Sequence, residues 1–271
     1  MEFLTILLSS LIGLIAPVGL VSDRIAEAAI RDQIDAEDLQ VRIDNVPTYR
    51  LLQGRIDRVR IAGRGLSVEP GFRIAALEVE TDAIAVDPRS LREGEPELEQ
   101  PLQAGVRVVL SQADLTQALR SRQVRSWLDD LNLGQFGGAG YEIRNPRIQL
   151  LDNNRIRLRA ALRQADSDEQ LAIVLESGLS ILAGRQLQFD SPTATLNGDP
   201  LPDRIVAGFA TGISQRFDLR TLQASGITAR ILKIEINPDQ LQLAAFVRVE
   251  PGADLLSENA IGTRIATRSS N

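Results

Sequence analysis

The chain has 271 residues and a formal charge of −6; 44% of its residues are hydrophobic and 24% are charged, so it is long and apolar enough to bury a core. It contains no histidine and no cysteine, which excludes imidazole catalysis, thiolate nucleophiles, disulfides and thiolate metal sites. The acidic balance argues against a nucleic-acid partner. Lys233, the single lysine, alternates with apolar neighbours as a solvent-facing strand residue does. What remains is carboxylate chemistry or no chemistry, and no motif selects a pair of acids.

The N-terminal segment, residues 1–21, carries no charge from Phe3 to Val21 and is interrupted by Pro17. Three structures fit such a segment: a membrane-inserted anchor, an atypical export signal, and a helix buried in the protein. Glu2 stands where an export signal normally has a basic residue. We expect an anchor or signal-like segment here, then a single domain over residues 22–250 and a polar, flexible tail over 251–271.

After a short amphipathic helix that begins near Ser22, apolar and polar residues alternate with the period of a half-buried strand. Asp152, Asn153 and Asn154 predict a tight turn between two of the strands. The predicted strands are Leu39–Ile43, Arg58–Ile61, Phe72–Val86, Val106–Leu110, Ile143–Leu151, Arg155–Leu162, Leu171–Leu182, Leu187–Leu196, Ile227–Ile236 and Leu241–Val249.

The apolar positions change phase at three places along these strands. The changes fall between Ile56 and Val59, between Ala76 and Leu77, and between Ile231 and Leu232. One inserted residue produces such a change, and a β-bulge is its usual form. Because bulges increase twist, the sheet is expected to be strongly twisted and to curl.

Two further helices are predicted. Ser111-x-x-Asp114 is a capping pattern for a helix that continues toward Leu131. A second helix follows Pro200, where four apolar residues recur every four positions: Leu201, Ile205, Phe209 and Ile213. The glycine-rich stretch 132–140 predicts an internal loop, and the acidic, proline-bounded stretch 88–101 a solvated one. The fold class is therefore α+β.

The strand faces are long and aliphatic, and only 4% of the residues are aromatic. From this pattern alone, the simpler interpretation is that the aliphatic side chains pack on one another. The alternative is an aliphatic groove, in which each buried acyl methylene contributes roughly 0.8 kcal/mol of binding free energy.

Four phrases carry a resemblance to a known family. They are LQVRIDNVPTYRLLQGRIDRVRIAGRGL (Leu39–Leu66), RIAALEVETDAIAVDPRSL (Arg73–Leu91), QLAIVLESGL (Gln170–Leu179) and SGITARILKIEINPDQLQLAAFVRV (Ser225–Val249). From about Met1 to Glu250 the chain resembles the bacterial LmeA-like family of phospholipid-binding proteins. The resemblance implies a tubular lipid-binding-like half-barrel, in which a twisted, bulged antiparallel sheet wraps around long helices. It also implies binding of anionic phospholipid in the cell envelope.

With the resemblance added, we expect a membrane-associated, non-enzymatic protein of the cell envelope, without cofactor or metal, that holds an acyl chain in an aliphatic groove and carries or presents the lipid. The alternative is an envelope scaffold or assembly factor with a dry core that acts through protein contacts. Arginines near strand ends are candidates for the phosphate: Arg58, Arg60, Arg155 and Arg157. The predicted lipid-binding residues are the inward strand positions Val41, Ile43, Val59, Ile61, Ile74, Val79, Val106, Val108, Ile173, Leu175, Leu243 and Val247.

Overall fold

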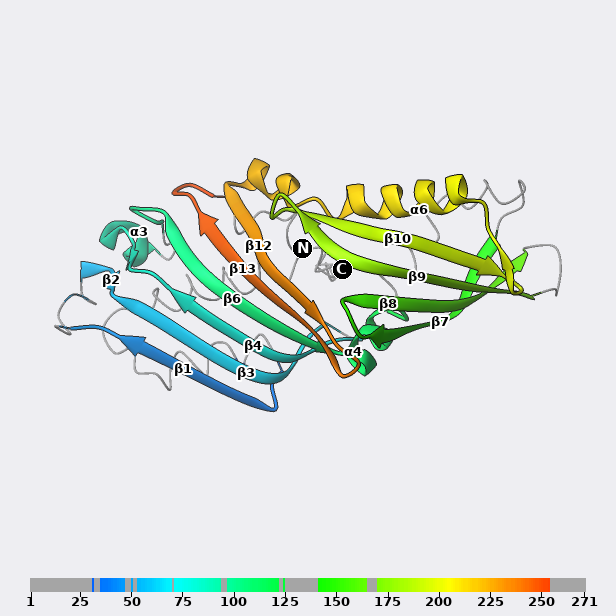
Figure 1. Ribbon diagram of the computed structural model, residues 1–271. Coiled ribbons are helices and arrows are strands. Elements are labelled where there is room, and N and C mark those ends of the chain that lie inside the picture. Colours follow the sequence, from blue (N-terminus) through cyan, green and yellow to red (C-terminus); the bar gives the residue numbers. More distant parts are fainter. Residues whose placement is uncertain are drawn as a thin grey trace, which may run out of the picture.

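The structure, a computed structural model, describes residues 31, 35–46, 50, 53–69, 71–93, 97–121, 124, 141–164 and 170–253. The hydrophobic segment 1–21, the helix expected near Ser22, the glycine-rich stretch 132–140 and all but the first residues of the predicted tail lie outside these residues. Two antiparallel sheets lie side by side and form an elongated body (Figure 1).

The first sheet has six strands in the order β1-β3-β4-β6-β13-β12. Their bounds are β1 Asp38–Asp44, β3 Arg58–Glu69, β4 Phe72–Thr81, β6 Leu102–Ser111, β13 Gln240–Val249 and β12 Ile227–Ile236. The C-terminal hairpin β12–β13 thus pairs with β6 and completes a sheet that begins near the N-terminus.

The second sheet has five strands in the order β11-β10-β9-β8-β7. Their bounds are β11 Asp199–Pro200, β10 Gln186–Leu196, β9 Gln170–Leu182, β8 Arg155–Gln164 and β7 Tyr141–Leu151. A small third sheet pairs β2 (Arg55–Ile56) with β5 (Ile84–Ala85). The strands predicted from period-two alternation are confirmed with one correction: the predicted strand Phe72–Val86 is divided into β4 and β5, which belong to different sheets. The tight turn is also confirmed, where Asn153 and Asn154 have φ of 59° and 57°.

The helices are short in the part of the chain that the structure describes. They are α3 (Pro88–Glu93), α4 (Gln112–Ala118), α6 (Asp203–Arg216) and the 3₁₀ helix η3 (Leu219–Ser225). The longest, α6, has 14 residues and lies along β10 (Figure 1). The antiparallel β-rich architecture and the helix after Pro200 are confirmed. The expected half-barrel around long helices is wrong for the described residues, because neither sheet there closes or curls around a helix.

Another correction concerns the acidic stretch 88–101, for which a solvated loop was expected. It begins with α3, whose start is held by the Asp87 carboxylate: Oδ1 accepts a hydrogen bond of 3.0 Å from the backbone N–H of Arg89. The isolated bridge between Val86 and Leu98 then returns the chain to the core, where Leu98 is buried.

Of the three predicted phase changes, one is a bulge at the expected place. The register between β12 and β13 shifts between Ile231 and Lys233, so Leu232 is the extra residue. The exposed Lys233 side chain pairs with Glu235, which confirms its solvent-facing position. The change before Val59 is a break between strands, since Asp57 separates β2 from β3 and the two strands pair with different partners.

The change at Ala76 is not a bulge. Strand β4 stays in register with β3 there, because Ala76 pairs with Arg64 and Ile74 with Leu66. Between these β3 residues, Gly65 has φ of +59°, and a Cβ atom on it would lie 2.3 Å from the Glu37 carboxyl carbon. A left-handed glycine thus rotates the strand pair and moves the buried positions to the other parity.

The two sheets meet at an apolar junction. Its buried residues are Leu150, Ile156, Leu179, Ile236 and Leu241, which come from both sheets. Helix α4 lies at this junction. The Gln112 side-chain oxygen accepts a hydrogen bond of 3.0 Å from the backbone N–H of Leu150. The predicted capping box at Ser111 and Asp114 is present.

Candidate functional site

Beside the junction, α6 and α4 enclose an apolar cavity of about 490 Å³ against one face of the five-stranded sheet. We call it the α6 cavity. Among the described residues that line it, Arg159 is the only one with a charged side chain. The others are Leu115, Ala118, Leu119, Val124, Ile143, Pro146, Ile148, Ile156, Leu158, Ala160, Leu162, Ile173, Leu175, Leu179, Leu187, Phe189, Ala194, Leu201, Ile205, Val206, Phe209, Ile213 and Phe217.

The helical wall of the cavity follows from the four-residue recurrence of apolar residues. Ile205, Phe209 and Ile213 share one face of α6, because side chains four positions apart lie above one another on a helix. Val206 on the same helix is buried against Leu175 and Ala194 of the sheet. Phe209 packs against the same cluster and also lines the cavity, so this contact fixes the helix on the sheet at one side of the cavity.

The sheet wall of the cavity follows from alternation along β8 and β9. Ile156, Leu158, Ala160 and Leu162 line the cavity. Of the residues between them in the sequence, Arg157 and Ala161 point to the opposite face, because successive side chains alternate along a strand. Arg159 is the exception, since it also contributes to the cavity lining. The rest of this wall is aliphatic, and Arg155 and Arg157 are separated from it by the thickness of the sheet.

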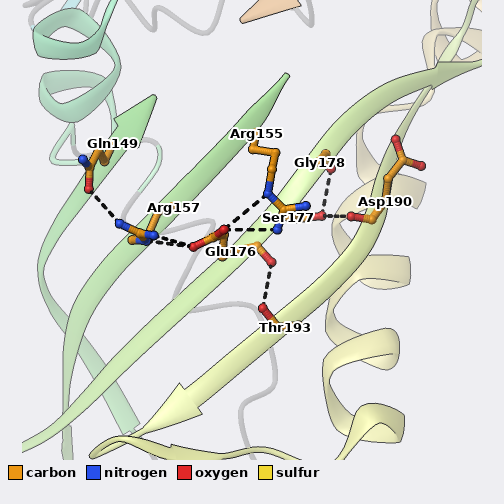
Figure 2. Close-up of polar contacts among 8 residues, drawn as sticks. All are labelled: Gln149, Arg155, Arg157, Glu176, Ser177, Gly178, Asp190 and Thr193. Atoms are coloured by element: carbon orange, nitrogen blue, oxygen red, sulfur yellow. Dashed lines mark hydrogen bonds and ion pairs between the residues drawn. The ribbon is translucent and has the colours of Figure 1, made fainter. Parts of the chain in front are cut away.

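On that opposite face, two arginines of β8 bind one glutamate of β9 (Figure 2). Arg157 Nη2 lies 2.7 Å from Glu176 Oε2, and Arg155 Nη2 lies 3.1 Å from Glu176 Oε1. Gln149 of β7 extends the row, since its Oε1 accepts a hydrogen bond of 3.4 Å from Arg157 Nη1. The hydrogen bonds from Arg157 and then Arg155 hold the pKa of Glu176 below its ordinary value, against the opposing effect of burial.

A buried hydroxyl group holds the neighbouring bulge between β9 and β10. The Ser177 Oγ lies 2.8 Å from the carbonyl oxygen of Gly178 and 3.1 Å from that of Asp190, and donates its proton to these carbonyls (Figure 2). The register between the strands shifts after Asp190. Ser177 is fully buried, and its hydroxyl finds its hydrogen-bond acceptors in two backbone carbonyls beside the bulge.

The twelve predicted lipid-binding residues lie in separate parts of the molecule. Ile173 and Leu175 line the α6 cavity, and Leu243 packs against the junction between the sheets. The other predicted residues belong to the main core of the six-stranded sheet, where they are buried or packed against buried residues: Val41, Ile43, Val59, Ile61, Ile74, Val79, Val106, Val108 and Val247.

The candidate head-group arginines are all ion-paired. Arg155 and Arg157 share Glu176, Arg58 Nη1 lies 3.0 Å from Glu80 Oε1, and Arg60 binds Asp44. The hydrogen bond from Arg60 holds the pKa of Asp44 below its ordinary value. A phosphate that binds these arginines must therefore compete with a carboxylate of the protein.

Sequence reasoning missed most of the cavity wall. The four-residue recurrence after Pro200 predicted α6 itself, but the helix was not assigned a part in the site. The same apolar face that identifies Ile205, Phe209 and Ile213 as helical also makes them cavity residues once the helix lies on β10. That recurrence was the signal from which these residues could have been found.

A β-rich fold with an apolar cavity of this size is typical of proteins that bind hydrophobic small molecules. The chain belongs to the LmeA-like phospholipid-binding family, whose model matches residues 16–246. The family is described by binding and not by catalysis. No curated protein and no solved structure matches the chain. Among the helices within the described ranges, none has the length and apolar character needed to cross a bilayer.

Proposed function

We propose that the protein binds a phospholipid by holding an acyl chain of the lipid in the α6 cavity, and that it carries or presents this lipid at a membrane of the cell envelope. The observation that carries the proposal is the wall of the cavity, which is aliphatic and aromatic apart from Arg159 among the described residues. An acyl chain is a ligand that needs such a wall and no specific polar partner. Membership of a phospholipid-binding family supports the same ligand.

The energetics favour a ligand with more than one chain. Burying about ten methylene groups contributes roughly 8 kcal/mol, while association costs about 4–15 kcal/mol in lost freedom of motion. A single short chain therefore binds weakly. A second chain, or a polar contact at the head group, raises the affinity into the range of a stable complex.

The predicted lipid contacts divide between the two sheets under this proposal. Ile173 and Leu175 contact the acyl chain directly. The residues of the six-stranded sheet, such as Val59 and Ile61, are only 2% and 3% exposed and shape the core that supports the junction. Head-group contact by Arg155 or Arg157 stays a prediction, and it requires that phosphate displaces the carboxylate of Glu176.

The test uses two neighbouring alanines of β8 that point to opposite faces. Ala160 lines the cavity, while Ala161 points away from it. Ala160→Phe fills the cavity and should remove most of the lipid that co-purifies with the full-length protein, as measured by native mass spectrometry. Ala161→Phe adds the same side chain outside the cavity and should retain the lipid. Circular dichroism establishes that both variants fold.

A second measurement removes the dependence on lipid acquired in the cell. Delipidated protein is titrated with a short-chain phosphatidylglycerol below its micelle concentration, so no membrane is needed. We expect saturable binding by the wild type and by Ala161→Phe, and at least tenfold weaker binding by Ala160→Phe. Equal binding by all three proteins, or binding by none, would overturn the proposal. Binding by none is the result expected of a scaffold with a dry core.

A further inference from the structure

Large apolar side chains that remain exposed are few in the described ranges, and most of them share one region. They are Val46, Leu182, Phe217 and Leu232, with exposed fractions of 80%, 53%, 52% and 69%. Leu182 ends β9, Phe217 follows α6 and Leu232 is the bulged residue of β12. Three segments that are distant in the sequence therefore each expose one such side chain, and only Val46 lies elsewhere.

Backbone hydrogen bonds bring these three segments together. The N–H of Ile231, next to Leu232, donates to the carbonyl of Gly184 in the β9–β10 turn at 2.7 Å. The N–H of Leu219, two residues after Phe217, donates to the carbonyl of Arg185 in the same turn at 3.0 Å. Figure 1 shows this turn between β12 and the segment that joins α6 to η3. The backbone segments that carry the exposed side chains thus meet at one turn, and Leu232 also borders a second hollow with Ala244 and Ala245 of β13.

Two exposed arginines flank the same turn. Arg185 lies within it, and the Cβ of Arg230 is 3.9 Å from the position of a Cβ on Gly184. Neither arginine forms a salt bridge with any residue that the structure describes, whereas the nearby Arg220 is bound to Asp218. The region therefore combines exposed apolar side chains with two arginines that form no salt bridge within the described residues. Asp218 lies nearby, and its pKa is lowered by its hydrogen bonds from Arg220 and also by the charge of Arg185.

This region is also continuous with the α6 cavity. Phe217 is half exposed and at the same time lines the cavity, so it lies where the cavity meets the surface. Leu187, which follows the β9–β10 turn, lines the cavity as well. We call the set Leu182, Arg185, Phe217, Arg230 and Leu232 the mouth patch.

We propose that the mouth patch docks onto the surface of a bilayer that contains anionic phospholipid, and that lipid passes between the bilayer and the α6 cavity beside Phe217. This inference rests on the proposed function, because it assumes that the cavity holds lipid. Apolar side chains enter the interfacial region of the bilayer, and arginines beside them attract the anionic head groups. The position of Phe217 favours a bilayer over a protein partner, because lipid has to enter and leave the cavity at this point and a bilayer is the source of lipid.

The test reports on the patch itself, so that binding through any other part of the chain does not decide it. Because the protein has no cysteine, single cysteines at Leu182 and Leu232 can be labelled with an environment-sensitive fluorophore in the full-length chain. Val46→Cys is the matched control, since Val46 is also apolar and exposed but lies between β1 and β2. The labelled proteins are mixed with vesicles of phosphatidylcholine that contain about 30–40 mole per cent phosphatidylglycerol, which makes the vesicle surface anionic.

We expect a blue shift and an intensity increase for the labels at positions 182 and 232, and no change at position 46. Arg185→Gln combined with Arg230→Gln should raise the vesicle concentration at half-signal by about fivefold for each arginine removed. Arg89→Gln combined with Arg204→Gln removes the same charge from exposed positions outside the patch and should leave it unchanged.

Two results would overturn the docking proposal: no response at positions 182 and 232, or an equal response at position 46. Neither result bears on lipid binding, which is measured separately with monomeric short-chain lipid in the absence of vesicles. A protein that binds the short-chain lipid but gives no label response keeps the proposed function and loses the docking patch. A protein that does not bind the short-chain lipid loses the proposed function, whatever the labels report.

Discussion

The side-chain amide of Asn154 links the two sheets through Ile236: the Asn154 Oδ1 accepts a hydrogen bond of 2.7 Å from the Ile236 backbone N–H. Its Nδ2 donates to the carbonyl of Ile234 at 3.3 Å. Asn154 belongs to the β7–β8 turn of the five-stranded sheet, and both backbone partners belong to β12 of the six-stranded sheet. One side chain thus satisfies two backbone groups at the edge of β12, directly beside the apolar junction.

We expect Asn154→Ala to lower the free energy of unfolding by about 2 kcal/mol, because the buried Ile236 N–H loses its partner. Chemical denaturation monitored by circular dichroism measures the change. Asn153→Ala is the control, because the two residues have nearly the same positive φ, 59° and 57°, so the backbone strain of an alanine is common to both variants. Equal destabilisation by the two variants would show that the amide contacts contribute nothing.

Local features of the fold were predictable from the sequence, because they depend on neighbouring residues. The alternation along β8 and β12, the turn at Asn153 and Asn154 and the cap at Ser111 each occupy a few positions. The bulge at Leu232 was also predictable, since an extra residue changes the phase of the apolar positions. The change at Ala76 has the same signature in the sequence but comes from the left-handed Gly65 on the neighbouring strand.

The division of the strands between two sheets was not predictable in this way. Val41 and Leu175 stand in similar alternating patterns, but Val41 is packed in the core of the first sheet and Leu175 lines the cavity of the second. The difference depends on the pairing of β6 with the distant β13 and on α6 lying along β10. Neither contact leaves a trace in local periodicity. For the same reason Arg157 was predicted as a head-group candidate without its ion pair, because Glu176 lies beside it on a strand that is distant in the sequence.

The cap of α4 should support both stability and the cavity. Ser111 Oγ accepts a hydrogen bond of 3.1 Å from the Asp114 N–H. Three residues in and directly after the helix line the cavity: Leu115, Ala118 and Leu119. We expect Ser111→Ala to cost about 1 kcal/mol of unfolding free energy and to weaken binding of short-chain phospholipid severalfold. Gln117→Ala at an exposed position of the same helix should change neither. A stability loss without a change in binding would separate α4 from the cavity.

Bound lipid should stabilise the fold by mass action. At a ligand concentration about one hundred times Kd, the gain is roughly 2.7 kcal/mol, which for a protein of this size raises Tm by about 5–10 °C. Differential scanning calorimetry of delipidated protein with and without short-chain phosphatidylglycerol measures the shift. We expect the shift in the wild type and in Ala161→Phe and its loss in Ala160→Phe. An equal shift in all three proteins would place the bound lipid outside the α6 cavity.

The row of charges on the outer face predicts a specific dependence on pH. Arg157 and Arg155 hold the pKa of Glu176 in the folded protein below its ordinary value of 4.5. The stabilisation is therefore fully present above about pH 5 and is lost as the pH falls through the lowered pKa. It is lost because the unfolded state binds the proton at a higher pH than the folded state does, which favours unfolding as the pH falls. We expect Glu176→Gln to lower the unfolding free energy at pH 7 by up to about 1 kcal/mol, and the difference from wild type to shrink steadily below pH 4.5. Urea denaturation at a series of pH values measures this difference in unfolding free energy.

Glu235→Gln is the control, because Glu235 binds only the exposed Lys233 within the described residues and should change stability less at every pH. A difference for Glu176→Gln that stays constant down to pH 3 would mean that its ion pairs do not stabilise the fold.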